Sequence, residues 1–188
     1  KDADGDVSTA TITMNVKGNT NEPCIITPHI GSFGTVVFEA GLPGGTESHT
    51  NSEATSGLFL VNLHGETGTV TVGEGNHAVT LTLNAAGQAV DGNGNAINWH
   101  NTSVSVDTGE GTLKITGVSN GVISYTYTLK AAVTNDVAHD FSVTDSIPIT
   151  VTDQTHDTTV GHLNIAIVDD APKAQSDFFT VGELSAQT

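Results

Sequence analysis

The chain has 188 residues, with 5 lysines and no arginine against 21 aspartates and glutamates, so its formal net charge is −16. So few cations cannot neutralise a phosphate backbone or an anionic membrane surface, which excludes nucleic acid as a partner, and the apolar runs are too short to span a bilayer. Leu, Ile, Val and Phe still make up a quarter of the residues, above the level of about 20% below which highly charged chains stay disordered. We therefore expect a folded acidic domain with no membrane insertion.

Stretches with period-two alternation of apolar and polar residues run through the whole chain and predict β-strands. Clusters of Gly, Asn, Asp and Ser separate them, as is typical of turns. Thr and Val, which suit a pleated sheet, are abundant, whereas helix formers are scarce. In chain order, the predicted strands are residues 9–16, 57–63, 69–72, 78–83, 103–106, 113–115, 122–129, 147–151 and 163–167.

Many short strands, separated by turn signals roughly every 8–12 residues, are typical of an antiparallel sandwich or barrel. We predict an all-β fold, an antiparallel β-sandwich of immunoglobulin-like or cadherin-like type. It is longer than a simple immunoglobulin-like domain of roughly 100 residues. The surplus falls mainly in two loops, residues 39–56 and 84–101.

A weak internal repeat sets the expected boundaries. An acidic turn and the strand after it, which begin at Asp2, have an echo that begins at Asp153, and each copy runs on to a proline. A fixed period indicates tandem modules, so the chain is expected to be a piece of a longer one. We expect a terminal strand and linker of the preceding repeat, or the first strand of this domain, in residues 1–21, the main sandwich module in residues 22–170, and a linker with the start of the next module in residues 171–188.

Side-chain oxygens recur at every second position in two of the predicted turns. Calcium takes six to eight oxygens, which Asp, Asn and backbone carbonyls on flexible loops supply. Crowded carboxylates repel one another unless a cation is present. Calcium is therefore the predicted cofactor, and the alternative for both turns is an ordinary Asx/Gly turn. The oxygen-bearing residues are Asp2, Asp4 and Asp6 in the first turn and Asp91, Asn93 and Asn95 in the second.

Further acids are expected at the ends of the module. Asp169 and Asp170 end a predicted strand just before a proline, where they could share an ion at a domain junction. Glu39 starts a loop that could cap such a site, and Asp153 and Asp157 form the acidic turn of the second repeat copy. We predict calcium contacts for these five residues, and for Asp169 and Asp170 the alternative is a solvated acidic linker.

Trp99 is the residue most suited to ligand binding. It lies in the segment 95–101, which comes directly after the turn at residues 91–95. An aromatic ring beside a calcium loop can pack a ligand whose carboxylate or hydroxyl completes the coordination of the metal. The predicted ligand site comprises Trp99 with Asp91, Asn93 and Asn95. The alternative is a half-buried tryptophan at the rim of the core.

Signals for catalysis are weak. The eight histidines are dispersed without the spacing of zinc ligands, and there is no Gly-x-Ser-x-Gly turn that would expose a nucleophile. The carboxylate pair of a glycosidase stays open as an alternative, although the chain offers only one Trp and two Tyr as sugar platforms. We predict that the protein is not an enzyme.

A family resemblance rests on four segments: Asp2-Ala-Asp-Gly-Asp6, residues 38–46, Tyr125-Thr-Tyr127-Thr-Leu129 and Ile167-Val-Asp169-Asp170-Ala-Pro172. In this order they resemble the tandem repeat domains of giant RTX adhesins that bacteria export by type I secretion, and the resemblance covers nearly the whole chain. It implies calcium-dependent β-sandwich modules at the bacterial cell surface, with neighbouring repeat modules as partners. It also implies roles in cohesion, adhesion or biofilm formation, and some such adhesins carry domains that bind sugars, ice or peptide ends through bound calcium.

Two readings of such a module compete. In the first, it binds a protein or peptide ligand on another cell through a calcium site and the enlarged loops. In the second, it is a passive extender that provides length and calcium-dependent stiffness. The inserted loops favour the first reading, whereas the scarcity of aromatic residues and the lack of arginine favour the second. An extracellular glycosidase is a third alternative.

Overall fold

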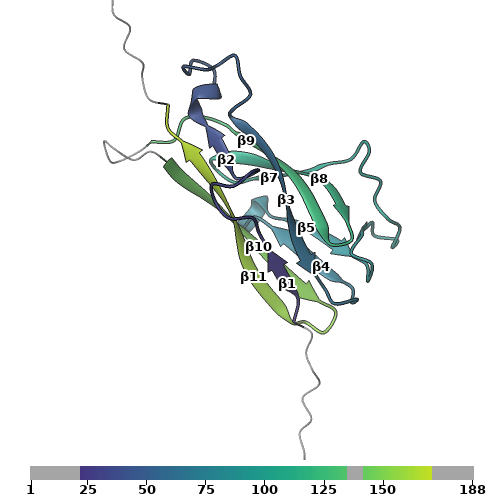
Figure 1. The fold of residues 1–188 in the computed structure, drawn as a ribbon. Helices are drawn as coiled ribbons and strands as arrows, with labels where there is room; N and C mark the ends of the chain where they lie inside the picture. Colours follow the sequence, from purple (N-terminus) through teal and green to yellow (C-terminus); the bar gives the residue numbers. More distant parts are fainter. Residues whose placement is uncertain (1–21, 135–141, 171–188) are drawn as a thin grey trace, which may run out of the picture.

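The computed structural model describes residues 22–134 and 142–170, and the statements below concern these residues. They form two β-sheets that pack face to face, so the prediction of an all-β sandwich is confirmed (Figure 1). Sheet A has the strand order β1-β3-β9-β8-β7, and sheet B has the order β2-β11-β10-β4-β5-β6. The elements are β1 (Cys24–Ile26), β2 (Val36–Phe38), η1 (Glu39–Gly41, a 3₁₀ turn), β3 (Ala54–Asn62), β4 (Gly68–Val72), η2 (Gly75–His77, a 3₁₀ turn), β5 (Val79–Leu83), β6 (Ala89–Val90), β7 (Val104–Asp107), β8 (Gly111–Ser119), β9 (Val122–Leu129), β10 (Ser142–Asp153) and β11 (Thr158–Val168).

The β8–β9 hairpin illustrates how the local sequence produces these strands. Every second side chain of β9 is buried, which matches the period of a pleated strand with one face on the core. Asn120 and Gly121 both have positive φ, 51° and 75°, as in the type I′ turn that an Asn-Gly pair favours. Ser119 and Val122 pair directly on either side of this turn, so the turn sets the register of the hairpin.

The core lies between the two sheets and combines aliphatic side chains with a few large aromatic ones. The rings of Phe59 and Tyr125 have their centroids 6.3 Å apart. The Tyr125 hydroxyl donates to the carbonyl of Gly34 at 2.9 Å, which satisfies a polar group that would otherwise be buried alone. A Cβ atom on Gly57 would lie 2.5 Å from this hydroxyl, so the contact requires glycine at position 57.

The first part of the described chain contributes to both sheets. β1 is the antiparallel edge strand of sheet A beside β3, whereas β2 runs parallel to β11 in sheet B. Between them, Thr35 is fully buried and its carbonyl accepts the N–H of Ala166 at 2.8 Å. The segment that runs from β1 to β2 therefore joins the two sheets along one side of the sandwich.

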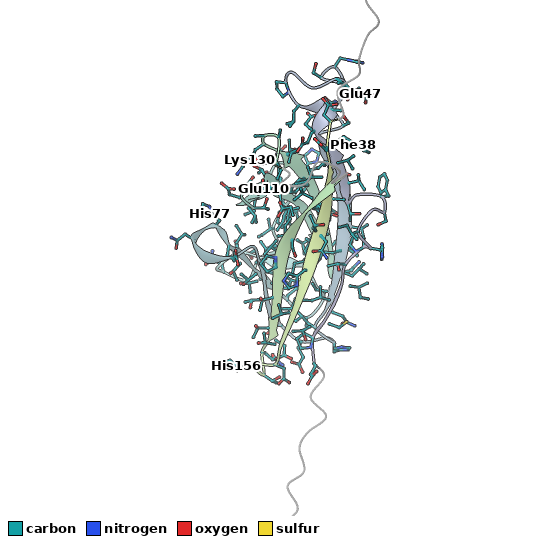
Figure 2. The ribbon with its side chains drawn as sticks, turned by 90° about the vertical axis from the view of Figure 1, so that its left-hand side faces the viewer. Phe38, Glu47, His77, Glu110, Lys130 and His156 are labelled. Carbon is teal, nitrogen blue, oxygen red and sulfur yellow. The ribbon has the colours of Figure 1, made fainter. Side chains whose placement is uncertain are left out.

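The described chain enters the sandwich at one end and leaves it at the other (Figure 1). We call the first end the N-terminal pole; it carries Pro23 and the turns at residues 63–67 and 153–157. The second end, the C-terminal pole, carries η1 and residues 169–170. Figure 2 shows His156 at one pole and Glu47 at the other.

The predicted strands are confirmed in position but differ in length. The prediction for residues 122–129 matches β9, whereas the predictions for 113–115 and 147–151 cover only the middle of β8 and β10. The sequence does not predict β1, β2 or β6, because strands of two or three residues are too short for alternation to be seen. The predicted strand at residues 9–16 and the segment 171–188 lie outside the described residues.

Candidate functional site

The parallel pairing of β2 and β11 brings acidic residues together at the C-terminal pole. Phe38 and Val168, the last residues of the two strands, are register partners, so the residues that follow them leave the sheet side by side. Glu39 follows β2 as the first residue of η1, and Asp169 and Asp170 follow β11. The structure thus groups three of the predicted site residues.

Glu39 is buried, with 6% of its surface exposed. Its Oε1 accepts the backbone N–H of Val133 at 2.7 Å, and the Asp169 side chain and the Asp170 backbone lie close enough to affect the pKa of its carboxyl group. Burial raises the pKa of Glu39 and the Asp169 carboxylate raises it further, against the lowering effect of the Val133 and Asp170 backbone. When Glu39 and Asp169 are both ionised, their negative charges repel each other, and a cation near both would reduce this repulsion.

Asp170 fastens the following loop to this pole. Its Oδ2 accepts the backbone N–H of Thr46 at 2.8 Å, and its Oδ1 accepts the Thr46 hydroxyl at 2.5 Å. A pocket of about 560 Å³ lies beside these groups. It is lined by the three acids, by Lys130 and by small or apolar residues that include Leu42, Pro43, Ala131 and Ala132.

The predicted site residues Asp153 and Asp157 lie in the β10–β11 turn at the N-terminal pole. Asp153 is 4% exposed, and its Oδ1 accepts the N–H groups of Thr155 and Asp157 at 2.9 and 3.0 Å and the Thr155 hydroxyl at 2.8 Å. Burial opposes ionisation of Asp153, but these hydrogen bonds outweigh it and lower its pKa. The carboxylate therefore stays ionised in a buried position.

Two carboxylate oxygens at this pole are buried without a hydrogen-bond partner, Oδ2 of Asp153 and Oε2 of Glu66. Glu66 lies in the β3–β4 turn, which contacts the β10–β11 turn through the hydroxyl of Thr67 and Oε1 of Gln154, 3.3 Å apart. A buried carboxylate oxygen calls for a donor or a cation. The N-terminal pole thus has unused capacity for a positively charged group.

The turn at residues 91–95 is placed differently. Asp91 is exposed, and its Oδ1 accepts the N–H groups of Asn93 and Asn95, each at 2.9 Å. These backbone hydrogen bonds lower the pKa of Asp91. The geometry is that of an Asx turn, in which the carboxylate is satisfied by its own loop.

Trp99 packs against the core and is half-buried, as in the alternative reading of this residue. Its Nε1 is buried without a hydrogen-bond partner, and no hydrogen bond connects it to Asp91 within the described part of the chain. Binding of a ligand by Trp99 therefore stays a prediction.

The described residues meet part of the requirement for calcium. Within residues 22–134 and 142–170, no three acidic, histidine or cysteine side chains are grouped closely enough to hold a metal ion. The C-terminal pole offers two carboxyl groups that interact electrostatically, and the N-terminal pole offers two unpartnered buried carboxylate oxygens. The other oxygens that calcium needs would have to come from backbone carbonyls, water or further residues. Asp2, Asp4 and Asp6 lie outside the described residues.

Two acids with buried carboxylate oxygens, Asp145 and Glu66, are not among the predicted site residues. Asp145 is 6% exposed, and its Oδ2 accepts the hydroxyls of Tyr127 at 2.7 Å and of Thr108 at 2.6 Å. Alternation along its strand, where it has the same parity as Ile147, is a signal that places this carboxylate inwards. Glu66 lies in a turn and carries no such signal.

The chain matches no protein-family model, no curated protein and no solved structure. No helix among the residues that the structure describes is both long and apolar enough to cross a membrane. Its function has to be inferred from its own residues and their placement.

Proposed function

We propose that this chain is a non-enzymatic, calcium-stabilised β-sandwich module of a large bacterial surface adhesin. The observation that carries the proposal is the position of its buried acids. Glu39 at one pole and Asp153 at the other are both more than nine-tenths buried, and each is near the point where the described chain enters or leaves the sandwich. Buried carboxylates at both junctions are what a module stabilised by cations between neighbours requires.

The strand order supports an immunoglobulin-like sandwich. Sheet A contains β1-β3-β9-β8, which corresponds to the order A-B-E-D, and sheet B contains β11-β10-β4-β5-β6, which corresponds to G-F-C-C′-C″ of a variable-type domain. β7 is an additional edge strand of sheet A. Modules of this type suit extracellular tandem arrays, in which neither nucleic acid nor a membrane is a partner.

Two roles within this proposal have separate support. The pocket beside Glu39, Asp169 and Asp170 supports a protein or peptide ligand on another cell, bound with the enlarged loop 39–56 and calcium in adhesion or biofilm formation. The entry and exit of the described chain at opposite poles supports a passive extender (Figure 1). We favour ligand binding at the C-terminal pole, because the predicted alternative around Asp91 already has its carboxylate satisfied within its loop.

Thermal unfolding with and without calcium tests the calcium requirement. Calcium that binds only the folded state adds about 2.7 kcal/mol at a concentration of 100 times its Kd, so we expect a clear rise in Tm that a chelator reverses. Glu39→Gln should reduce this rise, whereas Glu74→Gln, an exposed acid beside η2, should leave it unchanged. A Tm that does not respond to a chelator would contradict the proposal.

A peptide and glycan array separates the two roles. A ligand-binding module should give hits that disappear with a chelator, and an extender should give none. Hydrolysis of a polysaccharide by the purified protein would contradict both roles and favour a glycosidase.

A further inference from the structure

The outer face of sheet B carries two rows of side chains that cross four strands. Each row has four side chains, and seven of these eight residues are threonines. Their order follows from the registers of β11 with β10, of β10 with β4 and of β4 with β5. We call these rows together the threonine face. Read from β11 to β5, the first row is Thr158, Thr152, Thr69 and Thr82, and the second row is Val160, Thr150, Thr71 and Thr80.

These side chains point to solvent. The residues between them on β4, β5 and β10, such as Val70, Leu81 and Val151, belong to the core, so the alternation of the strands turns the rows outwards. Val160 is 60% exposed. Hydroxyl groups of neighbouring strands meet at 2.8 Å between Thr71 and Thr80 and at 3.0 Å between Thr152 and Thr158.

The threonine face and its continuation along β10 and β11 have no charged residue. No Asp, Glu or Lys occupies an outward position on β4, β5 or β11, or on β10 from Val143 onwards. The chain as a whole has a net charge of −16, and the outer face of sheet A contains Asp107 and Lys114. The continuation consists of Thr144, Ser146, Pro148, His162, Asn164, Ala166 and Val168.

We propose that the threonine face is a self-association surface, on which a second copy of this chain packs with its own threonine face. A hydroxyl group both donates and accepts a hydrogen bond, so a face of threonines is complementary to itself. Two molecules with a charge of −16 repel each other, and this face allows contact without placing one carboxylate against another.

The twist and the area of the sheet also fit a second copy. Adjacent strands of a sheet are rotated by roughly 20–25° relative to each other. A twisted surface of this kind does not match a flat crystal surface such as that of ice, whereas two equally twisted sheets pack face to face at about −30°. With strands about 4.8 Å apart and outward residues about 6.7 Å apart along each strand, the threonine face and its continuation together cover about 500 Å² per copy. Two copies bury about 1,000 Å², which is the lower limit for a specific interface and predicts a weak dimer.

The association does not use the carboxylates of either pole, so the experiments that test it do not depend on whether the calcium proposal is correct. Sedimentation equilibrium of the whole chain should give a mass that rises from monomer to dimer between about 10 µM and 1 mM, as for a weak interface. The dimer should strengthen as salt is raised from about 0.05 to 0.5 M, because salt screens the repulsion between the acidic copies.

Thr71 is the position to change, because it lies inside the second row between Thr150 and Thr80. Both Thr71→Glu and Thr71→Lys should abolish the dimer, since either places a charge in the contact. Thr71→Lys also reduces the net negative charge of the chain, so its loss of the dimer would not be due to stronger repulsion between the copies. Thr126→Glu, at an outward position of β9 in sheet A, should dimerise like the unchanged protein. Equal Tm values of the variants confirm that the fold is retained.

A protein that stays monomeric at about 1 mM in high salt overturns the proposal, as does a Thr71→Lys variant that dimerises as well as the unchanged chain. A monomer that is retained on immobilised neutral dextran, with retention lost in Thr71→Glu, would assign the face to a neutral glycan instead. Inhibition of ice recrystallisation by a monomer would assign it to ice.

Discussion

The turns at residues 91–95 and 153–157 have the same hydrogen-bond pattern in different surroundings. In each, Oδ1 of the first aspartate accepts the N–H groups of the third and fifth residues, and the backbone N–H of that aspartate donates to the carbonyl of the fifth. In each, the fourth residue has positive φ. Asp91 is exposed and its Oδ2 lies 3.4 Å from the side-chain amide of Asn95, whereas Asp153 is 4% exposed and its Oδ2 has no partner.

The difference between these turns shows what local sequence decides and what the fold decides. An aspartate followed by small or polar residues closes a five-residue turn in both places, because its carboxylate replaces missing backbone acceptors. The burial of the turn decides whether an unpartnered Oδ2 of this aspartate destabilises the fold. This oxygen is solvated in the first turn and lies at the N-terminal pole, close to the β3–β4 turn, in the second.

Truncation of the first aspartate of each turn to alanine should give the largest difference in stability between the two turns. Asp153→Ala removes the acceptor of three donors in a buried turn, so we expect Tm to fall by about 5–10 °C, whereas Asp91→Ala should lower it by about 1–3 °C. Thermal melting followed by circular dichroism measures both. Equal falls would mean that burial of the turn contributes nothing.

Replacement of either aspartate by asparagine tests whether its carboxylate contributes to calcium binding. In a chelator at neutral pH, Asp153→Asn should melt below the unchanged protein, because the amide lacks the negative charge that the N–H groups of Thr155 and Asp157 stabilise. In saturating calcium it should gain less stability than the unchanged protein, whereas Asp91→Asn should gain the full amount of about 2.7 kcal/mol at 100 times Kd. Calorimetry in both buffers tests this, and an identical calcium response in both variants would exclude a cation at Asp153.

Lowering the pH should reduce the stability contribution of the aspartates in both turns and increase that of Glu39. The pKa values of Asp91 and Asp153 are lowered in the fold, so their contribution to stability is present above the ordinary value of 3.8 and is lost as the pH falls through the lowered values. The pKa of Glu39 is raised, so its contribution is present below 4.5 and is lost as the pH rises through the raised value.

Melting curves in a chelator across this pH range check both signs. Asp153→Asn should flatten the acid side, and Glu39→Gln should remove the loss of stability above pH 4.5. A Glu39→Gln variant whose profile is unchanged on that side would contradict the assignment.

The smallest expected effect concerns the fourth residue of each turn. His156 has φ of 70° and Gly94 has φ of 83°, a region that side chains with a Cβ atom rarely adopt. His156→Gly should raise the free energy of unfolding by about 0.5–1 kcal/mol, and Gly94→Ala should lower it by about 1 kcal/mol. Urea denaturation resolves both, and a destabilised His156→Gly would point to a contact of the imidazole that outweighs the backbone strain.

The sequence predicts the sandwich well because both of its sheets bury one face. Residues such as Tyr125 and Ile149 lie at alternating positions of strands whose other face is solvated, and this pattern is visible without a structure. The same pattern predicts neither β1 nor β2, which have three residues each and form because neighbouring strands offer free edges.

The candidate sites are predictable to a lesser degree. Acid-rich turns can be located from composition, but the interaction of Glu39 with Asp169 depends on a parallel pairing between strands from opposite ends of the chain. The unpartnered oxygen of Glu66 likewise depends on burial at the N-terminal pole. Such contacts follow from topology, which a local pattern does not contain.

The parallel pairing of β2 with β11 has a mechanical consequence. Because the described chain enters at one pole and leaves at the other, tension between its ends pulls β2 and β11 in opposite directions along their length (Figure 1). The hydrogen bonds of this pair are then loaded in shear and must fail together, whereas an antiparallel hairpin pulled from its open end fails one bond at a time. A three-residue strand at this position therefore acts as a clamp against stretching.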